Sequence, residues 1–256
     1  MKANAFLFML EHFKGDEEFV KKIIDYKDRA DTKQMMVLTK FLDPHQRMIV
    51  QSVIGHSLML KSYGGMENAE YERMIICPDY YEIDKDDFNI VVFKVSYNEH
   101  FGTLRHKDVL GALMNLGIER DCIGDICEDP LSFACTRENS NYIRMNLTKI
   151  RRSSIELVET DEIITINHSY RMKEMVVSSM RLDKIISALF GLSRTKASEA
   201  IRSGLVKVNY KSIEDVNHLC HNSDVISFRR HGRAELIVTD RRTKQGNIVI
   251  EGKIYQ

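Results

Sequence analysis

The 256-residue chain has few of the features that mark membrane, secreted or disulfide-bonded proteins. No apolar run approaches the roughly 18 residues that a membrane-spanning helix needs. The short apolar patch in residues 1–10 ends at Glu11 and His12 without a small-residue cleavage site, so we expect no signal peptide. The five cysteines are odd in number and lack CxxC spacing, which is typical of the reducing cytoplasm. Only three prolines are present, which argues against long disordered linkers.

The chain also lacks recognisable motifs for cofactor or metal chemistry. Residues 64–65, Gly-Gly, are not followed by Lys-Ser/Thr as in a phosphate-binding loop, and no glycine-rich cofactor fingerprint follows a predicted strand. Residues 218–221, His-Leu-Cys-His, have no second pair of zinc ligands nearby, so we interpret them as a polar loop. An exposed turn explains the acids of residues 84–87. We therefore expect no cofactor, no metal and no catalytic residue.

The chain as a whole has no net charge, because it contains 37 basic and 37 acidic residues. These residues are unevenly distributed along the sequence. Residues 168–256 contain 16 Lys and Arg against 9 Asp and Glu, a net charge of +7. Residues 1–167 contain 21 and 28, a net charge of −7. A basic C-terminal third on an acidic body is typical of a protein with one nucleic-acid-binding end, although an inert solvated face has the same charge.

Residues 181–209 have the most specific pattern in the chain. Apolar residues recur at helical spacing from Leu182 to Phe190, which predicts an amphipathic helix that ends at Gly191. Ser193 is a good N-cap for a second helix, in which residues 194, 198 and 202 line a polar face. Residues 206–209 alternate as in a half-buried strand, and residues 224–229 predict another strand before a basic run.

This pattern resembles the S4-like RNA-binding domain. The matching positions are Arg181-Leu182-Asp183, Ser193-Arg194, Ala197, Ile201, Gly204, Val206, Val208-Asn209 and Asp224-Val225-Ile226. Many such domains have Gly after the Asn, whereas Tyr210 follows here, so the turn either has another geometry or only Asn209 is left-handed. Such a module would clamp folded RNA by its phosphates. We expect RNA contacts from Arg181, Ser193, Arg194, Lys196, Arg202, Lys207, Asn209, Arg229, Arg230 and Arg233.

The rest of the chain predicts an α+β, multi-domain protein. Residues 1–70 predict a helical N-terminal domain, with helices around residues 19–24, 35–42 and 48–54. Residues 71–160 read as strand-strand-helix-strand-strand-helix-strand, which predicts a ferredoxin- or RRM-like sandwich. The aromatic strand signature with which an RNA-recognition motif stacks bases is absent from it. Residues 161–180 are the expected linker, and residues 181–256 the expected S4-like domain.

A second resemblance covers essentially the whole chain. Residues 101–120, FGTLRHKDVLGALMNLGIER, and residues 123–126, IGDI, resemble the central region of YlmH-type bacterial proteins. Residues 176–183 resemble the entry of that family into its RNA-binding domain. The resemblance implies a helical N-terminal part, a middle α/β domain and a C-terminal S4-like domain. It also implies binding to tRNA and the large ribosomal subunit, and a part in ribosome-associated quality control, where stalled nascent chains receive C-terminal alanine tails.

The leading hypothesis is therefore a cytoplasmic, non-enzymatic factor that binds large-subunit rRNA and tRNA. One alternative is an RNA-modifying enzyme with its chemistry in the middle domain, since Arg181-Leu182-Asp183 also resembles the catalytic Asp motif of some pseudouridine synthases. Because that triplet opens a helix, we interpret Asp183 as a first-turn acid stabilised by the helix dipole. The other alternative is an adaptor, whose N-terminal helices recruit a protein partner while the basic end holds RNA.

Overall fold

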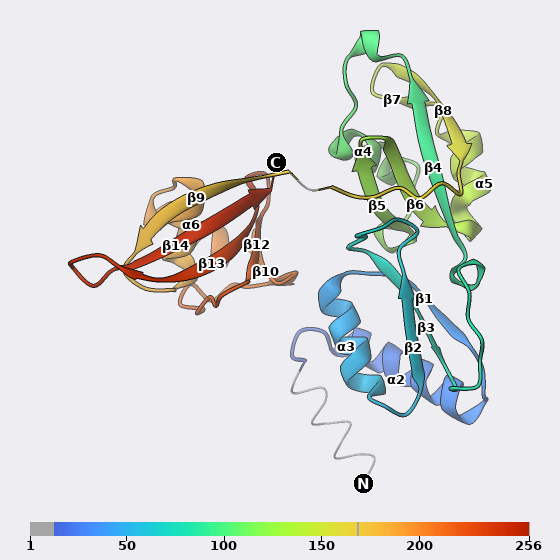
Figure 1. Ribbon diagram of the computed structural model, residues 1–256, viewed down its shortest axis with the longest axis horizontal. Helices are drawn as coiled ribbons and strands as arrows, with labels where there is room; N and C mark the ends of the chain where they lie inside the picture. The colour runs from blue at the N-terminus through green and yellow to red at the C-terminus, as the bar shows by residue number, and fades with distance from the viewer. Residues whose placement is uncertain (1–12, 168, 256) are drawn as a thin grey trace. The chain divides into compact units, whose positions relative to one another are not determined.

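The computed structural model describes residues 13–167 and 169–255. The chain divides into two compact units, with the division after residue 167 (Figure 1). The apolar patch of residues 1–10, on which the expected absence of a signal peptide depends, lies outside the described residues. Within the described part of the chain, none of the helices combines the length and the apolar character needed to cross a membrane.

The first unit begins with two helices on a three-stranded sheet. Its elements are α2 (Glu17–Thr32), β1 (Val37–Leu42), α3 (Pro44–Ile54), β2 (Met59–Tyr63) and β3 (Glu72–Cys77). The antiparallel strands follow the order β1-β3-β2. Helix α3 begins at Pro44 because the carboxylate of Asp43 accepts the amide of Gln46 at 2.8 Å in a capping box. Val20 and Ile23 of α2 are fully buried, as are Ile49 and Val50 of α3. The apolar stripes of both helices are therefore used in this core.

The helices predicted around residues 19–24 and 48–54 are confirmed as α2 and α3. The helix predicted over residues 35–42 is wrong, because residues 37–42 form β1. In this strand Thr39 accepts the amide of Met74 at 2.8 Å through its hydroxyl, and its carbonyl accepts Nε of Arg73 at 2.8 Å. A short apolar run fits a helix or a strand equally well, so pairing with β3 decides the outcome. The N-terminal part is thus mixed rather than helical.

The same unit continues with a second, five-stranded sheet. Its elements are η1 (Asp86–Phe88), β4 (Ile90–Tyr97), η2 (Glu99–Phe101), α4 (His106–Asn115), η3 (Arg120–Cys122), β5 (Ile123–Glu128), β6 (Leu131–Thr136), α5 (Arg137–Asn146), β7 (Lys149–Ile150) and β8 (Ser153–Glu159). The order is β5-β6-β4-β8-β7, and every pair is antiparallel. The sequence β4-α4-β5-β6-α5-β8 in this order is the ferredoxin-like arrangement, which confirms the predicted sandwich.

Both faces of this central sheet are covered. Phe93 and Phe133 pack with Val109, Leu113 and Ile143 of the two helices on one face. On the other face, strands β4, β5 and β6 pack against distant segments of the chain, and the buried residues there are Phe41, Met66, Val92, Cys127, Ala134, Ile164 and Ile166. All six residues of β6 are consequently buried. The face on which an RNA-recognition motif stacks bases is therefore closed by the chain itself.

Two expected boundaries differ from the strand pairing. Residues 72–77, which the sequence predicts to be part of the central domain, form β3 between β1 and β2. Residues 161–180 do not form one linker, because Ile164 and Ile166 are buried and Thr165 bridges Glu67. Tyr170–Val177 forms β9, which pairs along its whole length with the last strand of the chain. Strand pairing between distant segments has no local signature, which explains both differences.

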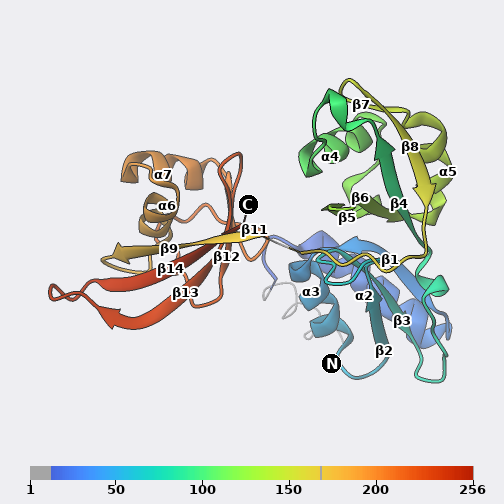
Figure 2. The ribbon, with the colours of Figure 1, turned by 45° about the horizontal axis from the view of Figure 1, so that its top comes forward.

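The second unit is one helical layer on a six-stranded sheet (Figure 2). Its elements are β9 (Tyr170–Val177), α6 (Leu182–Phe190), α7 (Arg194–Arg202), β10 (Val206–Val208), β11 (Lys211–Ser212), β12 (Val225–Phe228), β13 (Gly232–Arg242) and β14 (Ile248–Tyr255). The order is β11-β10-β12-β13-β14-β9. The predicted helices and the strands at 206–208 and 225–228 are confirmed. The core lies between the helices and one face of the sheet.

Candidate nucleic-acid interface

The start of helix α6 gathers two predicted RNA-contacting arginines around one buried carboxylate. Asp183 is 3% exposed and accepts hydrogen bonds from Nε and Nη2 of Arg181 at 3.0 and 3.1 Å. Nη2 of Arg194, at the start of α7, lies 3.6 Å from Oδ2 of the same carboxylate. Because the arginines come from the starts of two helices, Asp183 holds their guanidinium groups next to each other.

Asp183 has a larger role than that of a first-turn acid. Burial alone would raise the pKa of Asp183, but the hydrogen bonds and charge of Arg181, the backbone amide of Lys184 and the charge of Arg194 outweigh it and hold the pKa below its usual value. The ionised carboxylate is thus a positioning residue for two cations. The sequence contained a signal for this role, because an acid inside an apolar helical stripe needs a cationic partner when it is buried.

Helix α7 presents its other cations to solvent. Ser193 caps the helix as predicted, because its hydroxyl accepts the amide of Lys196 at 3.3 Å. The residues that α7 buries against the sheet are Ala197, Ala200 and Ile201. Arg194, Lys196 and Arg202 are all exposed, and the side chain of Arg194 retains 65% of its accessible surface. These three cations are therefore within reach of phosphates of a bound RNA.

A shallow groove beside Arg194 contains a cation that the sequence analysis missed. Its lining residues are Val176, Val177, Ser178, Lys184, Ser187, Ala188 and Arg194. The ammonium of Lys184 donates to the hydroxyl of Ser178 at 2.8 Å. Lys184 is easily overlooked because it interrupts the apolar stripe of α6. Its spacing of three residues from Arg181 was the available signal, since residues at this spacing are neighbours on a helix surface.

Lys207 and Arg233 lie on a different surface from the α7 cations. Val206 and Val208 of β10 are buried in the core beneath the helices, so Lys207 between them points to the opposite face of the sheet. Lys207 pairs with Ser227 of β12, and Ser227 pairs with Arg233 of β13, which places all three on that opposite face. The predicted residues therefore do not all lie on one surface of this unit.

Asn209 is exposed, but its side-chain amide is already used within the fold. Its Nδ2 donates to Oδ1 of Asp224 at 2.8 Å, and its Oδ1 accepts the amide of Val225 at 2.9 Å. Asn209 and Tyr210 both have positive φ values, 48° and 70°, in the two-residue turn between β10 and β11. The left-handed conformation is thus not confined to Asn209, and Tyr210 adopts the geometry for which the family often has Gly.

Arg229 and Arg230 occupy the turn between β12 and β13, and both are exposed. The amide of Arg229 donates to the carbonyl of Leu205 at 3.0 Å, which fixes the turn. The next residue, His231, stacks on the ring of Phe228 with 3.9 Å between centroids and 6° between planes. The turn is therefore a defined structure that carries two arginines.

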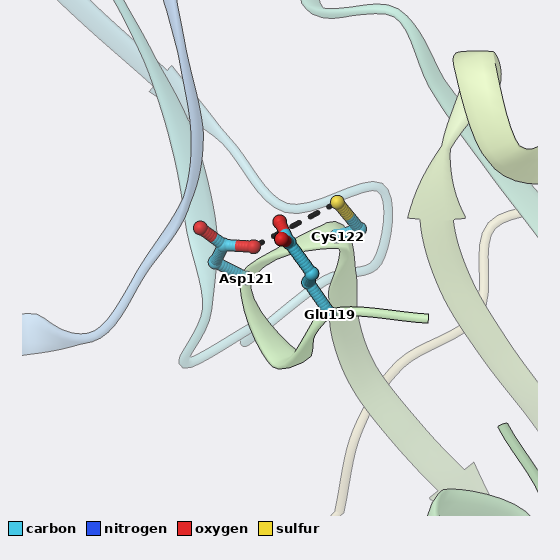
Figure 3. A group of neighbouring side chains, drawn as sticks. All are labelled: Glu119, Asp121 and Cys122. Atoms are coloured by element: carbon cyan, nitrogen blue, oxygen red, sulfur yellow. Dashed lines mark hydrogen bonds between the residues drawn. The ribbon is translucent and has the colours of Figure 1, made fainter. Parts of the chain in front are cut away.

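A cluster of possible metal ligands in the first unit is already bound by a lysine of the chain. Oxygen and sulfur atoms of Glu119, Asp121 and Cys122 come together near η3 (Figure 3). The ammonium of Lys40 forms ion pairs with both carboxylates and lies 2.9 Å from Asp121. The hydrogen bond to Glu119 is the main reason that the pKa of Lys40 is raised. The arrangement is an ion-pair contact between β1 and η3, because the lysine supplies the positive charge.

The hollow beside strand β4 bears on the alternative of an RNA-modifying enzyme. Arg137, Glu159 and Glu162 are among the residues that line it. Glu159 forms ion pairs with Arg137 at 3.4 Å and with Arg144 at 2.5 Å, and Glu162 pairs with Lys94 at 2.5 Å. These carboxylates are thus held by cations, which is typical of structural ion pairs and is a poor arrangement for general acid–base chemistry.

Comparisons with known proteins identify three consecutive family domains. Residues 15–81 match the family described as "YlmH, N-terminal", and residues 84–163 match the "Putative RNA-binding domain in YlmH". Residues 180–226 match the S4 domain. The three matches together extend over most of the chain.

Two relatives agree with these domains. The "Ribosome-associated protein quality control protein P2" of Bacillus subtilis (strain 168) is 30% identical over 241 residues, which cover 92% of this chain and 94% of the relative. The solved structure of "Cell division protein ylmH from Streptococcus pneumoniae" has 28% identity and a TM-score of 0.51. That match covers 57% of this chain and 92% of the solved chain.

Proposed function

Because this chain belongs to the YlmH family of RNA-binding, ribosome-associated proteins, we propose that it is a non-enzymatic cytoplasmic factor that engages rRNA and tRNA on the large ribosomal subunit. Its place would be ribosome-associated quality control, at the step where stalled nascent chains receive C-terminal alanine tails. The printed name of the Bacillus subtilis relative supports the quality-control assignment.

The observation that carries this proposal is the Arg181–Asp183–Arg194 cluster at the starts of α6 and α7. A buried carboxylate fixes two arginines, and Lys196 and Arg202 extend the positive surface along α7. Guanidinium groups that are already positioned lose less side-chain entropy when they bind phosphates than free ones do. Each phosphate contact also releases counterions, so affinity should fall steeply with salt. This is the behaviour expected of a clamp on folded RNA.

Crosslinking of the protein to RNA in cells, followed by sequencing, tests the proposal. The variant Arg194→Glu/Arg202→Glu reverses two charges on α7 and leaves the cluster around Arg181 partly intact. We expect reads from large-subunit rRNA and tRNA with the wild type, and a loss of at least about ten-fold with the variant, because two phosphate contacts become repulsive.

A charge-matched control separates a local effect from a change in net charge. Arg242→Glu/Lys244→Glu makes the same change at exposed residues of the β13–β14 hairpin, outside the proposed clamp. The control should retain the wild-type crosslinks. Equal losses in both variants, or crosslinks spread over unrelated RNAs, would contradict a specific clamp on α7.

A further inference from the structure

The face of the C-terminal sheet that is turned away from α6 and α7 has an unusual composition. Met175, Val177, Leu236 and Ile250 point into the core beneath the helices. The alternate residues of β9 therefore lie on the other face, and Tyr170, Met172 and Val176 there are 52%, 45% and 53% exposed. Within the described residues of this unit, no helix covers that face. We call it the open face.

One row of side chains runs across five strands of the open face. Lys207 of β10 pairs with Ser227 of β12, and Ser227 pairs with Arg233 of β13. Ala234 pairs with Ile254, so the next pair in this antiparallel register is Arg233 with Tyr255 of β14. Tyr255 in turn pairs with Tyr170 of the edge strand β9. Two cations and two tyrosines are thus aligned perpendicular to the strands.

The tyrosine rings of this row alternate with cations. The guanidinium of Arg233 lies 5.1 Å from the ring centroid of Tyr210 and 5.2 Å from that of Tyr255. The ammonium of Lys253 lies 4.5 Å from the centroid of Tyr170 and 5.9 Å from that of Tyr255. Cation–π contacts of this length hold the rings and the cations in fixed positions. We call these five residues the tyrosine–cation ladder.

The acidic residues of the open face are paired within it. Glu174 and Glu251 both bind Arg241, at 2.7 and 3.1 Å, and Glu235 accepts Lys253 at 3.4 Å. The paired Glu174 and Glu251 separate the exposed Met172 from the paired Val176 and Val249, so charged side chains interrupt the apolar patch that a protein partner would bury. The exposed ring of Tyr170 and the half-buried ring of Tyr255 beside cations instead fit a ligand with flat aromatic groups joined by phosphates.

We propose that the tyrosine–cation ladder is a stacking surface for unpaired RNA nucleotides, with bases on Tyr170 and Tyr255 and phosphates at Arg233, at Lys253 and at the neighbouring Lys207 of the same row. This inference rests on the proposed RNA-binding function and adds a second surface to it, on the face opposite the α7 clamp. A clamp of cations suits the phosphates of folded RNA, whereas exposed rings suit bases that are free of pairing. The unit can thereby hold a helical RNA and a neighbouring single strand on two faces.

The test measures binding of the full-length protein to a 12-nucleotide oligoadenylate and to an RNA hairpin with a fully paired stem. Tyr170→Leu/Tyr255→Leu should weaken oligoadenylate binding at least ten-fold, because stacking on each ring contributes about that factor. Hairpin binding should change less than two-fold. Since the chain has no tryptophan, oligoadenylate should also quench its tyrosine fluorescence, and the variant should lose that quenching.

Two further variants keep the result interpretable. Tyr170→Phe/Tyr255→Phe retains the rings and should bind oligoadenylate like the wild type, which excludes a general disturbance of the sheet. Tyr80→Leu removes a 63% exposed ring from the first unit and should have no effect. Because no charge is lost, Tyr170→Leu/Tyr255→Leu should also keep the wild-type salt dependence, whereas Arg194→Glu/Arg202→Glu should reduce it.

Each outcome separates this inference from the proposed clamp. Unchanged oligoadenylate binding by the tyrosine variant, together with loss of hairpin binding by the arginine variant, overturns the ladder and leaves the clamp standing. The reverse pattern overturns the clamp and supports the ladder. A wild type that does not bind oligoadenylate overturns the ladder. A tyrosine variant that loses only self-association in sedimentation also overturns it, because the open face would then bind a second copy of the chain.

Discussion

The central sheet and the C-terminal sheet are both covered by two helices on one face, but they differ on the other face. The second face of the central sheet is packed against Phe41, Met66 and Ile164, and strand β6 presents Ser132 and Ala134 to it. The second face of the C-terminal sheet is open, and its edge strand presents Tyr170, Met172 and Val176. The comparison indicates that the face on which an RNA-recognition motif stacks bases is buried in the central sheet, whereas no described helix of the second unit covers the other face of its own sheet.

The largest expected effect comes from placing a charge on the closed face. Ala134 is fully buried there, so Ala134→Arg forces a guanidinium into an apolar site without a carboxylate partner. We expect the free energy of unfolding of the first unit to fall by more than about 3 kcal/mol. Urea denaturation followed by circular dichroism measures this change.

The matched substitution on the open face is Val176→Arg. Its side chain is 53% exposed on β9, so we expect a change within about 0.5 kcal/mol. A similar large loss in both variants would show that the second face of the C-terminal sheet is also covered in solution, and the comparison would then fail.

A smaller effect on the free energy of unfolding is expected at Asp125 of β5, whose carboxylate accepts hydrogen bonds from the N-terminal part of the chain. Its Oδ2 accepts the amides of Glu70 and Tyr71, each at 2.7 Å. Burial raises the pKa of Asp125 to about 6 against the opposing effect of these amides. A carboxyl whose pKa is raised by folding contributes stability below pH 4 and loses that contribution as the pH rises through 6. Asp125→Asn should therefore gain about 2–3 kcal/mol relative to the wild type between pH 4 and pH 7.

Urea unfolding of both proteins at several pH values measures this trend. Asp161→Asn makes the same substitution at an exposed acid of the same unit and is the matched control. A stability difference for Asp125→Asn that does not change with pH would show that the buried carboxyl is not the source of the linkage.

The elements that the sequence predicts correctly are those with a strong local signal. Helix α7 has a capping serine and a polar face at spacings of four residues, and α6 has a five-residue apolar stripe. The periodicity of residues 35–42 is equally compatible with a helix, and only pairing with β3 makes them a strand. The pairing of Tyr170–Val177 with β14 joins residues about 80 positions apart, so nothing in its local pattern distinguishes it from a linker.

The candidate site shows the same limit. The cations of α7 can be predicted because helical spacing alone exposes them. The contact between Asp183 and Arg194 cannot, because it depends on how α6 packs against α7. The division of Lys207 from the α7 cations was contained in the alternation of residues 206–208, since neighbours in a strand point to opposite faces. That Arg233 and Tyr255 continue the row of Lys207 follows only from the register.

The smallest expected effect on the free energy of unfolding concerns the turn between β10 and β11, next to the open face. Tyr210 has a φ of 70°, which costs a non-glycine residue about 1 kcal/mol, so Tyr210→Gly should recover that amount. The same change removes the contact of Tyr210 with Arg233, worth about 0.5–1 kcal/mol. We expect the two terms to leave the free energy of unfolding within about 1 kcal/mol of the wild type, as measured by urea denaturation.

Asn209→Gly is the matched control, because glycine also accepts the φ of 48° there but cannot replace the hydrogen bonds to Asp224 and Val225. It should cost about 1–2 kcal/mol. The two neighbouring residues would then differ in kind, since Asn209 stabilises the turn while Tyr210 keeps a ring on the open face at little net gain in stability. A loss above 2 kcal/mol in Tyr210→Gly would contradict this view and would show that the ladder is needed to hold the sheet together.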